Sequence, residues 1–379
     1  MKKLGLNALV LNEESGGLGT YLKKLIEYLY SNSFKFEPII FLAEDTYELN
    51  DEYKHNKIFK MVKIKSNKPI HRIIREKYLW PKLLNENNVD ILHSPISYIP
   101  WGVNIPSIIT IHDLGFFHFP HNYTLLRRMF LKRTIKTSVE KAIKVITISA
   151  YTKEDITDTF DVNPDKVRYI YEGIDKEKYQ KRASSEKIQL AKDKYKLSDK
   201  YILSVGHLEP RKNYVKLIKA FGLIKRKFKL PHKLVIVGRE NWKYKEIFEL
   251  INNLGLNGHV VLTRFVSEDD LITIYQNADV FVTASIFEGF GFTPLEAMAS
   301  GVPVAASNVS SIPEVTGNAA NFFNPFDVDD IANKLYELIC NGQLRKELVH
   351  KGYRNLKRFD WKECFTQTVQ EYEKVLSVI

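Results

Sequence analysis

Two carboxylates flank a glycine-bearing turn and the predicted helix that follows it. Glu288 lies on the turn, and Glu296 lies eight positions later, in the early helix. Gly289 and Gly291 let the main chain approach a ligand closely, and Pro294 suits a first helical turn. Backbone N–H groups at a helix start lack partners within the helix, so they favour an anion such as a diphosphate. The pattern predicts a site for an extended ligand with phosphates, whose hydroxyl groups the two carboxylates could hold.

Two adjacent cations follow another predicted strand, in the segment GHLEPRKN at 206–213. Gly206 closes the strand, and Arg211 and Lys212 lie beyond it, at the edge of a parallel sheet where ligands bind. Arginine offers a fork to phosphate oxygens, and lysine offers a movable point charge. Each segment also has a simpler interpretation. The first is a common strand-to-helix turn whose acid suits the helix dipole, and the second is an exposed basic turn.

Two further candidate segments lie in the first half of the chain. Gly16 and Gly17, within SGGLGT at 15–20, follow the first predicted strand and open a helix, as a phosphate-binding loop does. This segment lacks the G-x-G-x-x-G spacing and the P-loop lysine. His112 and Asp113 end another predicted strand, where a lone histidine has either a structural or a catalytic role.

The sequence gives little support to metal chemistry. Asp327 and Asp329 form an Asp-x-Asp motif that could hold a divalent cation, but N-capping of the predicted helix explains it better. The chain has no HExxH zinc motif and no G-x-S-x-G nucleophile elbow. Cys340 and Cys364 fall in predicted helices outside any Cys/His cluster, which argues against a zinc site or a disulfide framework and fits a reducing cytosol.

Short β-rich segments alternate with helical segments along the chain, a pattern typical of parallel α/β layers. In the first half we predict strands at 4–11, 37–42, 90–93, 107–112, 144–149 and 167–171, and helices at 18–30 and 123–143. In the second half we predict strands at 201–206, 233–237, 259–263, 280–284 and 302–306, and helices at 213–227, 244–254, 269–276, 293–299, 328–340, 344–358 and 361–378. The lysine- and serine-rich stretch 175–200 is predicted to link the halves. Two doubly wound sheets in tandem would bind a ligand in the cleft between the carboxyl ends of their strands.

The basic composition favours anionic partners, since the net charge is +11 and the pI is about 9.2. Much of the excess lies in two clusters: His71, Arg72, Arg75 and Lys77, and Arg127, Arg128, Lys132, Arg133, Lys136, Lys141 and Lys144. These are either solvated helix faces or a docking surface for the anionic inner face of the cell membrane. No RNA-binding signature or zinc finger supports nucleic acid as the partner. The chain shows no membrane-spanning apolar run and no signal peptide, so we expect a cytoplasmic protein.

Taken together, the segments at 206–213 and 285–303 resemble the retaining glycosyltransferases of family 4, which have the GT-B fold. The hallmark Glu-x7-Glu is matched by Glu288 and Glu296 within EGFGFTPLEAMASGVPV. Further matches are GGLGTY at 16–21, IHDL at 111–114, YEGID at 171–175, LEPRKN at 208–213 and SSIPEV at 310–315. The phrase VGRENWKYKEI at 237–247 is similar to bacterial mannosyl- and rhamnosyltransferases that build surface polysaccharide.

The resemblance implies a role for each matched position. Glu288 would contact the donor sugar, and Glu296 would hold the ribose hydroxyls of the nucleotide. Arg211 and Lys212 would clamp the diphosphate, and His112 would reach the sugar and take part in catalysis together with Glu288 and the two cations. Further donor-binding positions would be Gly16, Gly17, Gly206, Gly289, Phe290, Gly291, Phe292 and Thr293. One departure is Arg264, where relatives often have glycine, which leaves base recognition nearby open.

The resemblance also implies an architecture and an activity. Two Rossmann-like domains would face each other across a cleft: residues 1–178 with 360–379 would bind the acceptor, and 179–359 would bind the nucleotide sugar. The enzyme would move a hexosyl group, with mannose or rhamnose favoured, from a nucleotide-diphosphate sugar to a saccharide or lipid-linked saccharide. It would need no metal or other cofactor, would retain the anomeric configuration, and a GDP-sugar is the favoured donor. Three alternatives remain: a sugar-nucleotide epimerase or phosphorylase of the same fold, a catalytically silent nucleotide-sugar-binding subunit, and a hydrolase that uses the two glutamates as acid and base.

Overall fold

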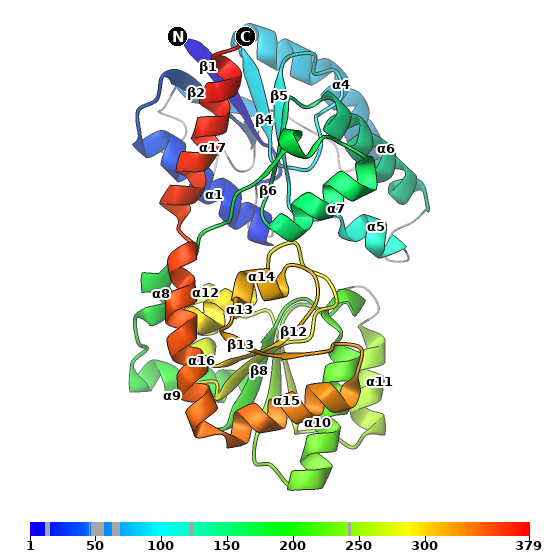
Figure 1. The fold of residues 1–379 in the computed structure, drawn as a ribbon, viewed down its shortest axis with the longest axis vertical. Helices are drawn as coiled ribbons and strands as arrows, with labels where there is room; N and C mark the ends of the chain where they lie inside the picture. The colour runs from blue at the N-terminus through cyan, green and yellow to red at the C-terminus, as the bar shows by residue number, and fades with distance from the viewer. Residues whose placement is uncertain (12–15, 45, 47–56, 63–68, 121–124, 242–243) are drawn as a thin grey trace. The chain divides into compact units, whose positions relative to one another are not determined.

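The chain forms two compact units in the computed structural model, which describes residues 1–379 except 12–15, 45, 47–56, 63–68, 121–124 and 242–243 (Figure 1). Unit 1 comprises Met1–Gly173 and Asp360–Ile379, and unit 2 comprises Ile174–Phe359. The first unit therefore ends at Gly173 instead of residue 178, and the chain returns to it at Asp360.

Unit 1 is built on a parallel sheet with the strand order β3-β2-β1-β4-β5-β6-β7. The strands are β1 (Lys2–Ala8), β2 (Phe36–Ala43), β3 (Phe59–Val62), β4 (Ile91–Ser94), β5 (Ser107–Ile111), β6 (Lys144–Thr147) and β7 (Val167–Tyr169). The helices are α1 (Gly16–Ser31), α4 (Pro69–Glu86), α5 (Gly115–His118), α6 (Leu125–Lys141), α7 (Ala150–Phe160) and α17 (Trp361–Leu376). Every residue of β5 is buried, as expected for a strand that is covered on both faces of its sheet.

Unit 2 is built on a second parallel sheet, with the order β10-β9-β8-β11-β12-β13. The strands are β8 (Tyr201–Val205), β9 (Lys233–Val237), β10 (Val260–Arg264), β11 (Val280–Thr283), β12 (Val304–Ser307) and β13 (Ala320–Phe323). The helices are α8 (Lys176–Gln180), α9 (Ser185–Tyr195), α10 (Tyr214–Phe228), α11 (Lys245–Asn253), α12 (Glu268–Gln276), α13 (Phe292–Ala299), α14 (Ile312–Thr316), α15 (Val328–Cys340) and α16 (Gly342–Asn355). The chain order reverses between β8 and β11, so the carboxyl ends of these two neighbouring strands mark the usual ligand position of a doubly wound sheet.

The prediction that residues 175–200 form a linker is wrong. This stretch contains α8 and α9 and belongs to unit 2. The Ser184 side chain accepts a hydrogen bond from the N–H of Lys187 and caps α9, while Tyr179 and Ala191 supply buried contacts. Two short strands, β3 and β13, were not predicted. The first predicted strand also ends earlier, at Ala8.

Helix α17 packs on unit 1 through apolar and charged contacts. Phe365 and Tyr372 lie in the core of this unit, and the Tyr372 hydroxyl lies 2.6 Å from Nδ1 of His93 in β4. Glu371 is only 3% exposed and is paired with three cations: Lys374 at 2.8 Å, Arg168 at 3.5 Å and Lys144 at 3.7 Å. Residues distant in sequence thus complete one core.

The sequence predicted an N-cap at Asp327 and no membrane-spanning helix. The Asp327 side chain accepts hydrogen bonds from the N–H groups of Asp329 and Asp330 at the start of α15, which confirms the N-cap. Among the helices that the structure describes, none is long and apolar enough to cross a bilayer.

Candidate active site

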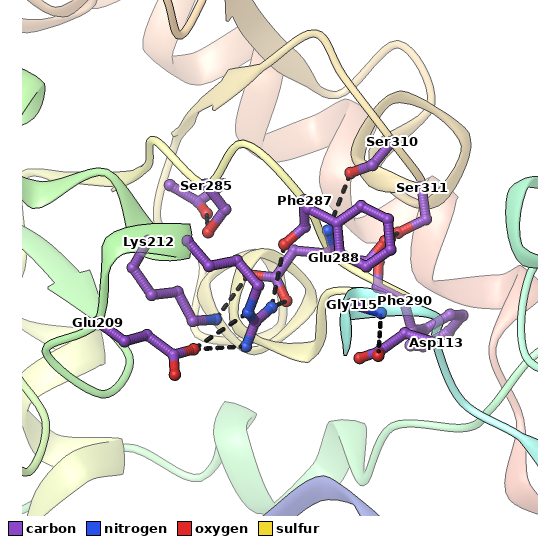
Figure 2. A network of polar contacts seen from close by, with 12 residues as sticks. Asp113, Gly115, Glu209, Lys212, Ser285, Phe287, Glu288, Phe290, Ser310 and Ser311 are labelled. Atoms are coloured by element: carbon purple, nitrogen blue, oxygen red, sulfur yellow. Dashed lines mark hydrogen bonds and ion pairs between the residues drawn. The ribbon is translucent and has the colours of Figure 1, made fainter. Parts of the chain in front are cut away.

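The acidic turn between β11 and α13 is the centre of the site in unit 2. Gly291 precedes the helix with φ of 102°, a backbone conformation that side chains disfavour. Serine hydroxyls hold the turn: Ser310 accepts from the N–H of Glu288 at 3.0 Å, and Ser311 donates to the carbonyls of Glu288 and Phe290, both at 2.9 Å (Figure 2). The start of α13 therefore occupies a fixed position at the strand ends, with its positive dipole end at the turn.

The structure brings Arg211 and Lys212 directly onto Glu288, and Figure 2 shows Lys212 beside this carboxylate. Nη1 of Arg211 donates to Oε2 of Glu288 at 2.6 Å, and Nζ of Lys212 donates to Oε1 at 2.6 Å. Arg211 also donates to the Phe287 carbonyl at 3.0 Å and to Glu209 at 2.8 Å. Because β8 and β11 are neighbours, residues 76 and 77 positions apart meet at one sheet edge.

The charges of this cluster fix the protonation state of Glu288. Burial alone would raise the pKa of Glu288, but Arg211 and Lys212 outweigh it and lower the pKa to about 2. Two carboxylates, Glu209 and Glu288, face two cations, so the cluster is neutral before any ligand arrives. Glu288 is ionised at neutral pH and is a hydrogen-bond acceptor only.

Gly206 makes room for the lysine. A Cβ atom at this position would lie 3.0 Å from Cε of Lys212, and φ of Gly206 is 151°. The Gly206 carbonyl accepts a hydrogen bond from the Tyr214 hydroxyl at 2.8 Å, which ties the strand end to α10. Gly206 therefore has a steric role, because it leaves space for the Lys212 side chain along the strand end. This role is compatible with the predicted one in donor binding.

Glu296 has a different environment from Glu288. Its Oε2 accepts a hydrogen bond from the Tyr275 hydroxyl in α12 at 2.7 Å, and the Tyr179 hydroxyl in α8 bonds to it as well. Burial raises the pKa of Glu296, although both tyrosine hydrogen bonds act in the opposite direction. Sequence reasoning missed both tyrosines. Tyr179 lies in the stretch that was predicted as a linker, and its charged neighbours gave no indication that it is buried.

The candidate residues of the first half, His112, Asp113, Gly16 and Gly17, lie in unit 1. His112 follows β5, and its Nε2 lies 3.2 Å from the Pro95 carbonyl. Asp113 accepts from the N–H of Gly115 at 2.8 Å, a structural role at the start of α5. Gly16 and Gly17 are exposed at the start of α1, with φ of 53° at Gly16, whereas Ser15 lies outside the described residues.

Arg264 departs from the glycine that the resemblance would place there. It ends β10 with φ of 62°, in the left-handed region that favours glycine, and pairs with Glu240 at 3.1 Å. The position therefore has the backbone of a glycine but carries a long charged side chain, which is exposed.

Comparison with known sequences identifies the family. Residues 15–178 match the model of Glycosyltransferase Family 4, and residues 185–355 match that of Glycosyl transferases group 1. The O-antigen chain mannosyltransferase B of Escherichia coli is 30% identical over 75% of this chain and 74% of its own length. The chain belongs to glycosyltransferase family 4. The serotype-specific mannosyltransferase WbdA of E. coli is 31% identical over 62% of this family 4 chain, although the match spans only 29% of WbdA.

Solved structures show the fold of this glycosyltransferase. A glycosyltransferase from Rickettsia africae superposes with a TM-score of 0.77 at 21% identity, covering 99% of this chain and 98% of its own. Anabaena HepE, solved in complex with UDP, gives 0.73 at 17% identity over 99% and 100% of the two chains. The predicted GT-B fold and transferase class are confirmed, and no relative named here favours the epimerase, phosphorylase or silent-subunit alternatives.

Proposed function

We propose that this glycosyltransferase moves a mannosyl or related hexosyl group from a nucleotide-diphosphate sugar to a saccharide or lipid-linked saccharide. The observation that carries the proposal is the cluster of Arg211, Lys212 and Glu288 at the carboxyl ends of β8 and β11, beside the start of α13. The two similar E. coli proteins are mannosyltransferases, which supports a mannosyl donor.

The diphosphate would bind Arg211, Lys212 and the N-terminus of α13. As the leaving group departs, negative charge grows on its β-phosphate, and groups fixed in advance stabilise that charge without reorganising. Loss of one such donor costs about 3 kcal/mol, on the order of a hundredfold in rate. Arg211→Ala should therefore lower transfer about a hundredfold while the protein stays folded.

We propose that these cations, and no metal, neutralise the leaving group. EDTA should leave the rate unchanged. Loss of activity in EDTA with recovery on adding manganese would disprove metal independence.

Retention is proposed from the family resemblance, and the departing phosphate would take the acceptor proton. NMR of the product tests this, since an inverted anomeric centre would refute it.

The opposite pKa shifts of Glu288 and Glu296 are also what an acid–base pair of a hydrolase would show. However, both oxygens of Glu288 are engaged by cations. Donor hydrolysis as the sole activity, even with acceptor saccharide present, would favour the hydrolase.

We further propose that the enzyme works in the cytoplasm at an anionic membrane surface. Helix α6 exposes Leu125 and Met129 at 68% and 61%, close in sequence to Lys132 and Lys136. Exposed apolar side chains close to cations suit contact with an anionic membrane surface. Four further residues of the two basic clusters have side chains outside the described residues: His71, Arg72, Arg75 and Arg127. Sedimentation with vesicles of phosphatidylglycerol, but not of phosphatidylcholine, is the expected result. Equal binding to both lipid compositions, or binding to neither, would refute the membrane proposal.

Calorimetric titration with GDP, UDP and dTDP tests the donor assignment. We expect GDP to bind most tightly and GDP-mannose to be turned over. UDP is the main competitor because HepE was solved with UDP. If none of the three nucleotides binds, or if binding survives in the double variant Arg211→Ala and Lys212→Ala, the proposed site is wrong.

A further inference from the structure

Glu172, which follows β7, is a buried acidic residue of unit 1. Its side chain is 1% exposed, and neither carboxylate oxygen has a hydrogen-bond partner among the described residues. Its ionisable partner is His112, whose Nδ1 lies 3.5 Å from Oε1 of Glu172. A buried carboxylate without compensation is strongly disfavoured, so this group needs a proton or a cation at close range.

Three ionisable neighbours of this pair are uncharged at neutral pH. Tyr21 in α1 packs edge-on against the His112 ring, with centroids 5.3 Å apart, and burial raises the pKa of Tyr21. Burial, aided by the nearby His112, lowers the pKa of His93 in β4 to about 3. Burial also raises the pKa of Cys364 in α17. Among these neighbours only His112 can supply positive charge to Glu172.

The hydrogen bond on the other side of the ring fixes one proton. Nε2 of His112 faces the Pro95 carbonyl at 3.2 Å, and a carbonyl only accepts, so Nε2 carries hydrogen. If Nδ1 were bare and Glu172 ionised, two acceptors would face each other in a buried place. One further proton, on either Nδ1 or Oε1, makes one of the two atoms a hydrogen-bond donor and removes this conflict.

We propose that Glu172 and His112 share this proton and act as a unit, with Glu172 as a positioning residue that keeps His112 a hydrogen-bond donor through Nε2. Resting on the proposed function, the inference adds that the ring donates to an oxygen of a bound substrate in place of the Pro95 carbonyl. The His112 side chain is 19% exposed, so its edge is open to such a ligand while Glu172 stays buried. His112 then acts as a hydrogen-bond donor and not as a general base.

The pKa of Glu172 agrees with this arrangement. Burial raises this pKa, and the adjacent His112 acts in the opposite direction. The shared proton should leave the pair as the pH rises, so the donor function of His112 should weaken at alkaline pH.

Nitrogen NMR of the full chain labelled with ¹⁵N-histidine tests the pair without any substrate. His112→Gln identifies the ring signals among the ten histidines. In the wild type at pH 7.5, Nδ1 of His112 should be shifted towards the protonated position, and Glu172→Gln should move it back towards a bare imine nitrogen. Glu371→Gln, which removes another buried carboxylate of unit 1, should leave the signals in place. Indistinguishable His112 spectra in the wild type and Glu172→Gln between pH 6 and pH 9 would overturn the proposal.

Stability provides a second measurement that does not depend on catalysis. His112→Asn leaves Glu172 without its cation, so its thermal midpoint should fall, and adding Glu172→Gln to that variant should recover most of the loss. Additive effects of the two changes would contradict a coupled pair.

Turnover of GDP-mannose then separates this inference from the proposed function. Glu172→Gln should reduce turnover roughly ten- to hundredfold, the range of one charged hydrogen bond, and should remove the alkaline decline expected of the wild type. An NMR difference without turnover of any nucleotide sugar would refute the proposed function and keep the pair. Turnover that is unaffected by Glu172→Gln would refute the positioning role.

Discussion

Removing the charge of Glu288 should weaken unit 2 by an amount that follows from the ion pairs. The pKa of Glu288 falls from 4.5 to about 2 on folding, and each unit of pKa corresponds to about 1.4 kcal/mol. The side chain is only 12% exposed, so solvent screens the pairs weakly. Glu288→Gln should therefore lower the stability of unit 2 by about 3 kcal/mol at pH 7.

The pH dependence has a definite sign. Because the folded pKa lies below the unfolded one, the stabilisation is complete above pH 4.5 and is lost as the pH falls towards about 2. Two-unit chains rarely unfold in one step. Hydrogen exchange of peptides from β11 and α13, followed through increasing denaturant, measures the opening free energy of unit 2 by itself.

Glu209→Gln is the matched control. Glu209 is 18% exposed, and its carboxylate pairs with Arg211 and not with Lys212, so its removal should cost less. An equal loss in both variants, or a wild-type stability that is flat between pH 4.5 and pH 2, would refute the electrostatic reasoning.

Three further changes test other contacts. Tyr275→Phe removes the 2.7 Å hydrogen bond to Glu296 and should weaken nucleoside-diphosphate binding by about 1 kcal/mol, roughly fivefold, in calorimetry; a 2′-deoxy nucleotide should bind both proteins alike. Asp327→Ala removes the cap of α15 and should cost about 1 kcal/mol in denaturant unfolding of unit 2, whereas no loss would mean that the cap is dispensable. Glu371→Leu leaves three cations without their buried partner and should increase hydrogen exchange in α17 but not in α13.

The regular elements were largely predictable because buried parallel strands and amphipathic helices leave local signals. β9 and α15 have the predicted bounds. β3 and β13 were missed because each is a four-residue edge strand with two partly exposed residues. α8 and α9 were missed because each buries a single residue, which gives almost no apolar periodicity.

The candidate site was predictable in composition but not in contacts. Sequence reasoning named Arg211, Lys212 and Glu288 as separate ligands of a donor, whereas the structure pairs them with one another. That pairing depends on β8 and β11 being neighbours, which the order of the chain does not reveal. Glu172 gave no signal either, because only the fold shows that this acid is buried beside His112.

The return of residues 360–379 to unit 1 has a consequence for synthesis on the ribosome. Unit 2 is an insertion whose sheet and helices are all encoded before residue 360, so it can fold while unit 1 still lacks α17. Although unit 1 emerges first, it is the later of the two to be completed. Until then, the strand face that Tyr372 and Phe365 cover stays open to solvent, which makes this face the place where a nascent chain needs protection from aggregation.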